Sequence, residues 1–188
     1  GDGDRGGGEE ATTACDAQDL LLAAINDPNP VILFEHRLLY DIPGEVADNF
    51  PSVPFRRTVV RRKGTDVTIV TSSYMVVEAL KAAEYLAAHG VEAEIVDPVT
   101  LVPMDEKPIL ESIQKTGRLL VVDAGWVPCG VSAEIAALAS EKAFSSLKAP
   151  VVRLGMAQVT CPVSKPLEKL FYPDADAIAK AVFGLLGK

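Results

Sequence analysis

Hydrophobic positions beyond residue 65 alternate between two periods. Four runs predict strands, at residues 66–71, 91–96, 119–122 and 150–154. The first is rich in β-branched residues, and residues 119–122 are hydrophobic throughout, as expected when both faces of a sheet are covered. Apolar side chains repeat at helical spacing in the segments between and after them, at residues 73–89, 104–115, 130–147 and 174–186. Strands alternating with helices of this length predict βαβ units and a mainly parallel sheet.

The chain before residue 66 follows a different pattern. An apolar stripe predicts a helix that Thr13 or Asp16 caps and that the proline-rich segment 26–30 ends. Residues 31–34 predict a buried strand. Because one helix and one strand cannot form a core, we interpret residues 11–40 as the tail of a domain that is mostly absent.

Two further segments flank this tail. Residues 1–10 are glycine-rich and acidic, and we expect them to be flexible and outside the fold of what is a fragment of a longer chain. Residues 41–65 are an irregular linker with several prolines. Within it, residues 57–62 add an edge strand whose charges discourage unwanted pairing.

Composition excludes several classes of function. Eighteen basic and 26 acidic side chains give the 188-residue chain a net charge of −8, so it lacks the basic field that nucleic acids require. No apolar run approaches the roughly 20 residues of a membrane span, and no secretory signal is visible. The three cysteines lack the spacing of a zinc or thioredoxin motif and are expected to be free, buried thiols.

Motifs for autonomous catalysis are missing. The turn after residues 66–71 has no G-x-G-x-x-G fingerprint, and the chain has no Walker loop, nucleophile elbow or H-E-x-x-H helix. Only two histidines occur, His36 and His89, and they lie too far apart in sequence to suggest a histidine-rich metal site. We therefore assign no catalytic, cofactor-binding or metal-binding residue.

Three segments allow both a structural and a functional interpretation. The turn 125–130 is either a tight glycine-assisted connection or an anion site with Ser132, and its Trp126 is a candidate interface anchor. His36 follows a predicted strand end and has either a structural or a site role, whereas His89 suits a helix end. Residues 160–173 either pack back on their own domain or dock to another subunit.

Five stretches, in order, resemble the C-terminal domain of transketolase-like thiamine diphosphate enzymes. The resemblance is greatest to the beta subunit of the first component of 2-oxoacid (pyruvate-type) dehydrogenase complexes. The stretches are DPNPVILFEHRLLY at 27–40, GTDVTIV at 64–70, VDPVTLVPMD at 96–105, GWVPCGVSAEI at 125–135, and residues 162–173. Many members have His-Glu after the third parallel strand, where this chain has Asp123 and Ala124, so the substrate class stays open.

The resemblance implies an α/β fold with three α/β/α layers and a five-stranded, mostly parallel sheet. Residues 57–62 would be its antiparallel edge strand, residues 66–188 the C-terminal-type domain, and residues 11–40 the end of a pyrimidine-binding domain. In such enzymes the preceding domain carries the glutamate that activates the cofactor, and the alpha subunit holds the diphosphate and its metal. This chain alone is therefore expected to bind neither thiamine diphosphate nor magnesium.

The resemblance also implies a role in assembly. The full enzyme would oxidatively decarboxylate a 2-oxoacid and pass the acyl group to lipoamide, in a bacterial cytoplasm or an organelle matrix. The expected partners are an alpha subunit, a dimer mate and a lipoyl-bearing acyltransferase core. The candidate interface residues are Glu35, His36, Tyr40, Trp126, Cys129, Leu167, Phe171 and Tyr172.

Two alternatives to this role remain. One is a free-standing binding or regulatory module of the same fold. The other is a fragment of a transketolase or a deoxyxylulose-phosphate synthase. The EHRLLY stretch at residues 35–40 favours the dehydrogenase branch.

Overall fold

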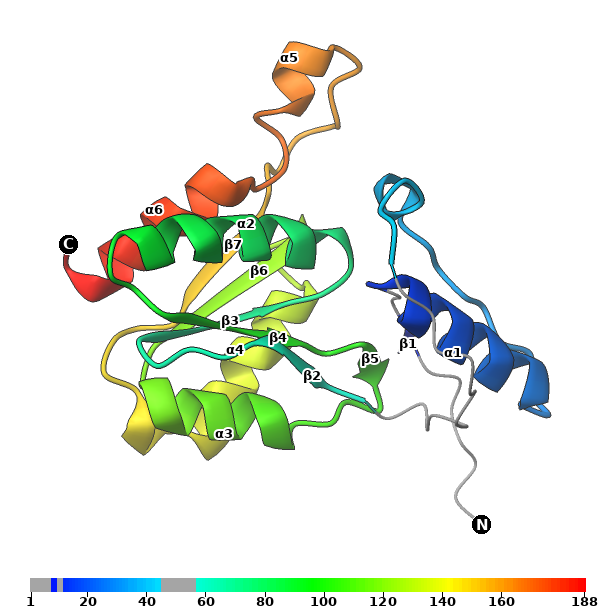
Figure 1. Cartoon of the computed structure of the whole chain (residues 1–188), viewed down its shortest axis with the longest axis horizontal. Coiled ribbons are helices and arrows are strands. Elements are labelled where there is room, and N and C mark those ends of the chain that lie inside the picture. Colours follow the sequence, from blue (N-terminus) through cyan, green and yellow to red (C-terminus); the bar gives the residue numbers. More distant parts are fainter. Residues whose placement is uncertain (1–7, 10–11, 45–56) are drawn as a thin grey trace.

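A five-stranded sheet forms the centre of the computed structural model, which describes residues 8–9, 12–44 and 57–188 (Figure 1). The strands lie in the order β2-β4-β3-β6-β7. Their bounds are Val59–Arg62 for β2, Val67–Thr71 for β3, Ala93–Asp97 for β4, Leu119–Trp126 for β6 and Val152–Met156 for β7. All neighbours are parallel except β2, which pairs antiparallel with β4 at the edge. The predicted sheet and its antiparallel edge strand are confirmed.

Helices cover both faces of this sheet. Helices α2 and α6 lie on one face, and α3 and α4 lie on the other (Figure 1). Their bounds are Tyr74–Ala88 for α2, Lys107–Thr116 for α3, Val131–Lys142 for α4 and Ala175–Leu186 for α6. The three-layer α/β/α arrangement is thus confirmed. No helix in the described ranges is long and apolar enough to cross a membrane.

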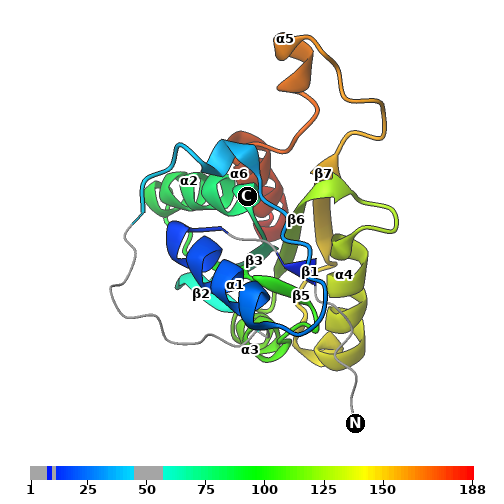
Figure 2. The same cartoon turned by 90° about the vertical axis from the view of Figure 1, so that its right-hand side faces the viewer.

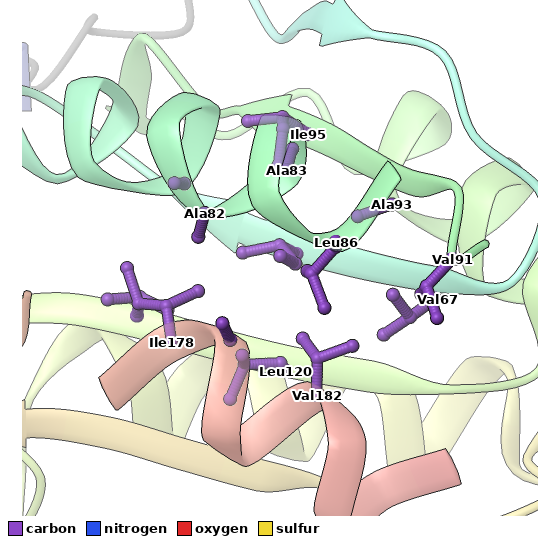
Figure 3. Close-up of a cluster of buried hydrophobic side chains, with 14 of the residues drawn as sticks. Val67, Ala82, Ala83, Leu86, Val91, Ala93, Ile95, Leu120, Ile178 and Val182 are labelled. Atoms are coloured by element: carbon purple, nitrogen blue, oxygen red, sulfur yellow. The ribbon is translucent and has the colours of Figure 1, made fainter. Parts of the chain in front are cut away.

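Each face of the sheet buries its own hydrophobic core. Val67 of β3 packs on the α2 and α6 side, together with Ile178 of α6 (Figure 3). Val70 of the same strand packs on the opposite side with Ile113 of α3 and Ile135 of α4. Because successive side chains of a strand point to opposite faces, a strand between two helical layers needs consecutive apolar residues. This is why β3 is buried along its whole length.

Helix ends follow the prediction less closely. Ser73 is the N-cap of α2, but its φ is 54° and its side chain makes no capping hydrogen bond. Helix α4 ends at Lys142, earlier than expected, and a short 3₁₀ helix, Phe144–Ser146, follows it. The backbone N–H of Lys148 then donates to the carbonyl of Gly117 at 2.7 Å. This bond holds the segment after α4 beside the start of β6. A helix that continued to residue 147 would prevent this contact.

The residues before the main sheet contain one helix and little else that is regular. Helix α1 spans Ala14–Asn26, and a 3₁₀ helix spans Arg37–Leu39. Strand β1, Gly8–Glu9, pairs antiparallel with β5, Thr100–Val102. These two residues were expected to lie outside the fold, so the expectation is wrong for them. The rest of segment 1–10 lies outside the described residues.

The strand predicted at residues 31–34 does not form. Only Phe34 takes part in an isolated bridge, and the side chains of Ile32 and Phe34 are 71% and 66% exposed. A strand needs a neighbouring strand that pairs with its backbone groups. Among the described residues, no strand runs alongside this segment.

Residues 157–173, which we call the arm, project from the body between β7 and α6 (Figures 1 and 2). The arm contains the short helix α5, Lys165–Glu168. Its base is closed by a backbone hydrogen bond, in which the N–H of Ala157 donates to the carbonyl of Phe171 at 2.9 Å. The arm therefore leaves and rejoins the body at one place.

The three cysteines are free, but the prediction that they are buried is wrong. Cys129 and Cys161 are exposed, and Cys15 is half-buried. Cys129 lies in the turn before α4 and Cys161 lies in the arm, and both segments are outside the packed layers. The apolar character of a thiol does not bury it when its segment lies on the surface.

Candidate functional site

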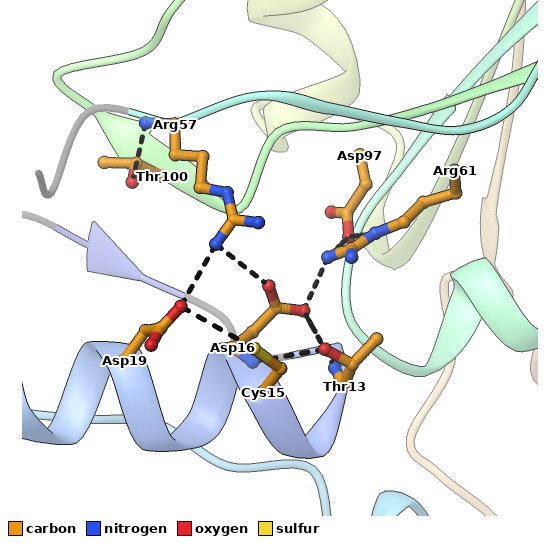
Figure 4. Close-up of polar contacts among 8 residues, drawn as sticks. All are labelled: Thr13, Cys15, Asp16, Asp19, Arg57, Arg61, Asp97 and Thr100. Carbon is orange, nitrogen blue, oxygen red and sulfur yellow. Dashed lines mark hydrogen bonds and ion pairs between the residues drawn. The ribbon is translucent and has the colours of Figure 1, made fainter. Parts of the chain in front are cut away.

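A buried ionic cluster joins α1 to the edge of the sheet (Figure 4). Nη2 of Arg61, on β2, donates to Oδ2 of Asp16 on α1 at 2.5 Å. The same nitrogen lies 2.8 Å from Oδ2 of Asp97 on β4. Nε of Arg61 donates to the same oxygen of Asp97 at 2.9 Å. The side chains of Asp16 and Asp97 are almost fully buried. One guanidinium therefore bridges two carboxylates that water barely reaches.

Local capping positions the first of these carboxylates. Thr13, one of the two predicted caps, is the N-cap of α1, and its Oγ1 accepts from the N–H of Asp16 at 3.1 Å. In return, Oδ2 of Asp16 accepts from the N–H of Thr13 at 2.9 Å. This reciprocal pair is a capping box, and it orients the carboxylate of Asp16 toward β2.

A second arginine extends the cluster toward the surface. Nη1 of Arg57 lies 3.5 Å from Oδ1 of Asp16 and 3.4 Å from Oδ2 of Asp19 (Figure 4). The side chain of Arg57 is about one third exposed, so solvent screens these pairs more than the pairs of Arg61. The buried contacts of Arg61 therefore contribute more to the attachment of α1 to the sheet than the contacts of Arg57 do.

Burial perturbs the protonation of the cluster. Loss of hydration raises the pKa of Asp97 to about 6, although the adjacent Arg61 acts in the opposite direction. For Arg61 itself, burial lowers the pKa, but the charges of Asp97 and Asp16 outweigh this and raise it. Arg61 therefore stays charged, and the pKa of Asp97 lies well above the ordinary value of an aspartate.

A pocket of about 510 Å³ opens beside this cluster, between the segment 12–44 and α2. Its walls are mainly apolar, with acidic and basic side chains at several points. The lining includes Thr13, Ala17, Leu39, Ile42, Arg61, Val76, Leu80, Lys81 and Glu84. Its volume is in the range of ligand and partner pockets.

Three predicted interface residues meet at this pocket. Glu35, His36 and Tyr40 all line it. The hydroxyl of Tyr40 donates to Oε2 of Glu35 at 2.9 Å, and this bond raises the pKa of Tyr40. The ring of His36 stacks on Tyr74 of α2, with centroids 5.1 Å apart. His36 thus connects the segment 12–44 to the sheet domain through a ring contact.

The other five predicted interface residues lie elsewhere, along the turn after β6 and on the arm. Trp126 ends β6 with about half of its side chain exposed, and Cys129 is exposed in the following turn. Leu167 and Tyr172 are partly exposed on the arm, whereas Phe171 is 5% exposed. Phe171 is therefore already covered by its own chain, where its ring meets that of Tyr172 edge-on.

The turn before α4 is organised by glycines and a carboxylate. Asp123 accepts from the N–H of Gly125 at 2.9 Å. A Cβ at Gly130 would lie 2.1 Å from the carbonyl oxygen of Trp126 and 3.2 Å from Oδ2 of Asp123. A carboxylate beside this helix start disfavours a second anion. The geometry therefore supports the tight-turn interpretation over an anion site with Ser132.

The described residues do not gather side chains of the kind that bind metals. Within residues 8–9, 12–44 and 57–188, no three His, Cys, Asp or Glu side chains converge as metal ligands would. The one buried acidic cluster is already bridged by Arg61. We therefore derive no chemical step through a cofactor on these residues.

Sequence reasoning missed the ionic cluster. Arg57 and Arg61 lie in the predicted edge strand, where their charges were interpreted as protection of an exposed edge. Arg61 is instead 14% exposed and paired on both sides. One signal was available: Asp97 directly follows an apolar strand, and a carboxylate at that position needs a cation.

Comparisons with known proteins give one family and one fold. A family model described as the C-terminal domain of transketolase matches residues 56–178. A solved structure, described as an inactive beta4 tetramer of a split-gene transketolase, superposes with a TM-score of 0.78 at 26% identity. The superposition covers 96% of this chain and 57% of that chain.

Curated relatives are beta subunits of two kinds. The chain is 39% and 43% identical to beta subunits of acetoin:2,6-dichlorophenolindophenol oxidoreductase from Bacillus subtilis and Cupriavidus necator. It is 43% identical to the mitochondrial pyruvate dehydrogenase E1 component subunit beta-1 of Arabidopsis thaliana. These matches cover 90–92% of this chain and 48–51% of the relatives. The chain spans about half the length of the curated relatives it matches.

Proposed function

Because the chain belongs to the transketolase C-terminal domain family, we propose that it is the assembly half of a dehydrogenase beta subunit. The full enzyme would use thiamine diphosphate to decarboxylate a 2-oxoacid oxidatively and transfer the acyl group to lipoamide. The pyruvate dehydrogenase beta subunits among the relatives support this reaction, and the acetoin oxidoreductase beta subunits support the role as a beta-subunit half. The split-gene transketolase structure matches this chain at 26% identity, below the 39–43% identity of these beta subunits, so the dehydrogenase branch is favoured over the transketolase alternative.

One observation carries the proposal: the segment 12–44, which we call the N-terminal unit, exposes many apolar side chains. The large apolar residues that are at least half exposed are Leu21, Ile25, Ile32, Phe34, Leu38 and Tyr40. So many in one short segment is the pattern of an interface, because soluble surfaces rarely expose large apolar patches. In the longer relatives, the half that lies outside the match to this chain would supply the cover.

The ionic cluster supports the same arrangement of domains. We assign residues 11–40 to the end of a pyrimidine-binding domain, residues 41–65 to a linker with the antiparallel strand, and residues 66–188 to the C-terminal domain. Arg61 anchors α1 to the sheet through Asp16 and Asp97. A rigid attachment of this kind would set the orientation of the preceding domain, whose position determines where the cofactor meets the alpha subunit.

Partners and compartment follow from the same proposal. We assign an alpha subunit, a dimer mate and a lipoyl-bearing acyltransferase core as partners. Thiamine diphosphate and magnesium would be held by the alpha subunit and the preceding domain, and this chain's residues would contribute packing. The bacterial and mitochondrial relatives support a bacterial cytoplasm or an organelle matrix.

A chimera tests the proposal. The matched half of the Cupriavidus necator acetoin oxidoreductase beta subunit is replaced by this chain and produced together with that enzyme's partner subunits. We expect co-purification and acetoin-dependent reduction of dichlorophenolindophenol, because the chain supplies the same assembly half. A folded chimera that never co-purifies with those subunits contradicts the proposal.

Two variants test whether assembly depends on the exposed apolar side chains of the N-terminal unit. Ile32→Asp together with Phe34→Asp places charge on the exposed face of the N-terminal unit and should abolish assembly. Phe144→Asp changes a residue that is 74% exposed on the 3₁₀ helix after α4 and should leave assembly intact. Equal loss in both variants would point to general instability and would contradict a specific face.

A further inference from the structure

The pocket beside the ionic cluster combines apolar walls with one buried hydroxyl. Its apolar lining includes Leu39 and Ile42 of the N-terminal unit and Val76 and Leu80 of α2. Thr12 also lines the pocket, although only 9% of this residue is exposed. Oγ1 of Thr12 has no hydrogen-bond partner among the described residues. Because a buried polar atom without a partner is costly, this position is where the pocket would hold the polar group of a ligand.

A second unpartnered oxygen lies next to Thr12. The Thr12 hydroxyl is close enough to Asp97 to act against the rise in the pKa of that carboxyl. Oδ2 of Asp97 accepts from Arg61, whereas Oδ1 has no hydrogen-bond partner in the described part of the chain. Asp97 follows Ile95 by two residues and therefore points to the same face of the sheet, which is the face that α2 covers. Thr12 and Asp97 thus present two free acceptor oxygens on the pocket's side of the sheet.

The ionic cluster carries an excess of negative charge. It contains the carboxylates of Asp16, Asp19 and Asp97 but only the guanidiniums of Arg57 and Arg61 (Figure 4). One negative charge is therefore uncompensated when every group of the cluster is ionised. A buried charge is stable only when an opposite charge lies close to it. A cationic group beside Thr12 would supply that charge.

The other charged side chains that line the pocket have the same preference. Glu35 and Glu84 line it and form no ion pair with another described residue. Lys81 lines it too, but its Nζ lies 2.7 Å from Oε1 of Glu78. Arg61 is already bound to two carboxylates. The charges left without an ion pair around the pocket are thus acidic, and they favour a positively charged ligand.

We propose that this pocket binds a small primary alkylammonium compound. Its ammonium group donates to Oγ1 of Thr12 and to Oδ1 of Asp97, and its alkyl chain lies against Val76 and Leu80. An ammonium group has three donors and no acceptor, which matches two acceptor oxygens beside an excess negative charge. The cavity of about 510 Å³ has room for an aliphatic body longer than a lysine side chain. The inference concerns residues of this chain alone and does not depend on the proposed function.

Calorimetric titration of the wild-type chain with a ligand series tests the proposal. At about pH 8, where Asp97 is ionised, octylammonium should bind with a dissociation constant of about 1 mM or lower. Octanol lacks the charge and octyltrimethylammonium lacks the donors, so each should bind at least about tenfold more weakly. No binding of octylammonium at about 10 mM overturns the proposal. Octanol or octyltrimethylammonium binding as tightly as octylammonium overturns it as well.

The length of the alkyl chain distinguishes a small amine from a lysine side chain of another protein. Butylammonium reproduces the end of a lysine side chain but covers less of the apolar walls. Octylammonium should bind at least about tenfold more tightly than butylammonium, because it buries four more methylene groups. Equal binding of the two amines would assign the site to a lysine side chain and would overturn the small ligand.

Variants and methyl resonances locate the bound amine. Thr12→Val should weaken octylammonium binding at least about tenfold and leave octanol binding unchanged, which shows that the pocket is intact. Thr65→Val changes an exposed threonine before β3 and is the matched control, which should bind normally. In the wild-type chain, the methyl resonances of Val76 and Leu80 should shift during the titration. Equal losses in the two variants, or unshifted Val76 and Leu80 resonances, overturn the assigned site.

Discussion

Asp16 and Asp97, from α1 and from the end of β4, meet at the same guanidinium nitrogen of Arg61. This shared contact joins α1 of the N-terminal unit to the edge of the sheet through one buried cation. Buried ion pairs add little stability over apolar packing, but removing one partner is costly because the other charge stays buried. The cluster therefore specifies orientation more than it adds to the free energy of folding.

Arg61→Ala should be strongly destabilising. It leaves Asp16 and Asp97 buried together without their shared cation, at a cost of about 3–5 kcal/mol in the free energy of unfolding. Urea denaturation followed by circular dichroism measures the loss. Lys107→Ala removes only an exposed pair with Glu111 and should change stability by less than about 0.5 kcal/mol. Similar losses in the two variants would contradict the role given to the buried cluster.

Stability should fall with rising pH because of Asp97. Its pKa is raised from 3.8 to about 6 in the folded chain, so between these values the folded state keeps a proton that the unfolded chain has lost. The free energy of unfolding then decreases from about pH 4 to pH 6, by about 3 kcal/mol from this group. Urea midpoints measured across this range should show the decrease. Asp97→Asn should remove that part of the slope, and an unchanged slope would refute the assignment.

Gly64→Ala should disrupt the edge of the sheet. A Cβ at Gly64 would lie 2.3 Å from the carbonyl carbon of Ala93, a backbone atom that cannot move independently of β4. We expect a loss of about 3 kcal/mol, the upper part of the range for overpacking. Gly184→Ala is the opposite case, because nothing lies within 4 Å and the residue is in α6. Gly184→Ala should raise the free energy of unfolding by about 1 kcal/mol, which raises the thermal midpoint of unfolding by a few degrees.

The elements of the sheet domain were predictable because their signals are local. Residues 67–71 are five consecutive β-branched residues, which is the pattern of a strand, and β3 occupies that position. Thr13 was one of the two predicted caps of α1, and its side chain accepts the expected backbone hydrogen bond from Asp16. These features depend on residues within a few positions of one another.

The contacts of the candidate site were not predictable in the same way. Arg61 meets Asp16 and Asp97 only after β2 has paired with β4 and α1 has packed beside them. Residues 31–34 resemble a buried strand in sequence, yet the segment has no strand beside it among the described residues. A periodic hydrophobic pattern indicates which side chains tend to be buried. It does not identify the helix or strand that packs against them.

The central claim is that the exposed apolar face of the N-terminal unit is covered by a preceding half. Its most direct test is the environment of a tryptophan at position 34, introduced by Phe34→Trp in a Trp126→Phe background. In the isolated chain, this tryptophan should be quenched readily by acrylamide and emit as in water. In the chimera with the preceding half of the Cupriavidus necator beta subunit, we predict a blue-shifted emission that acrylamide quenches poorly. Equal quenching in the two proteins would contradict the account.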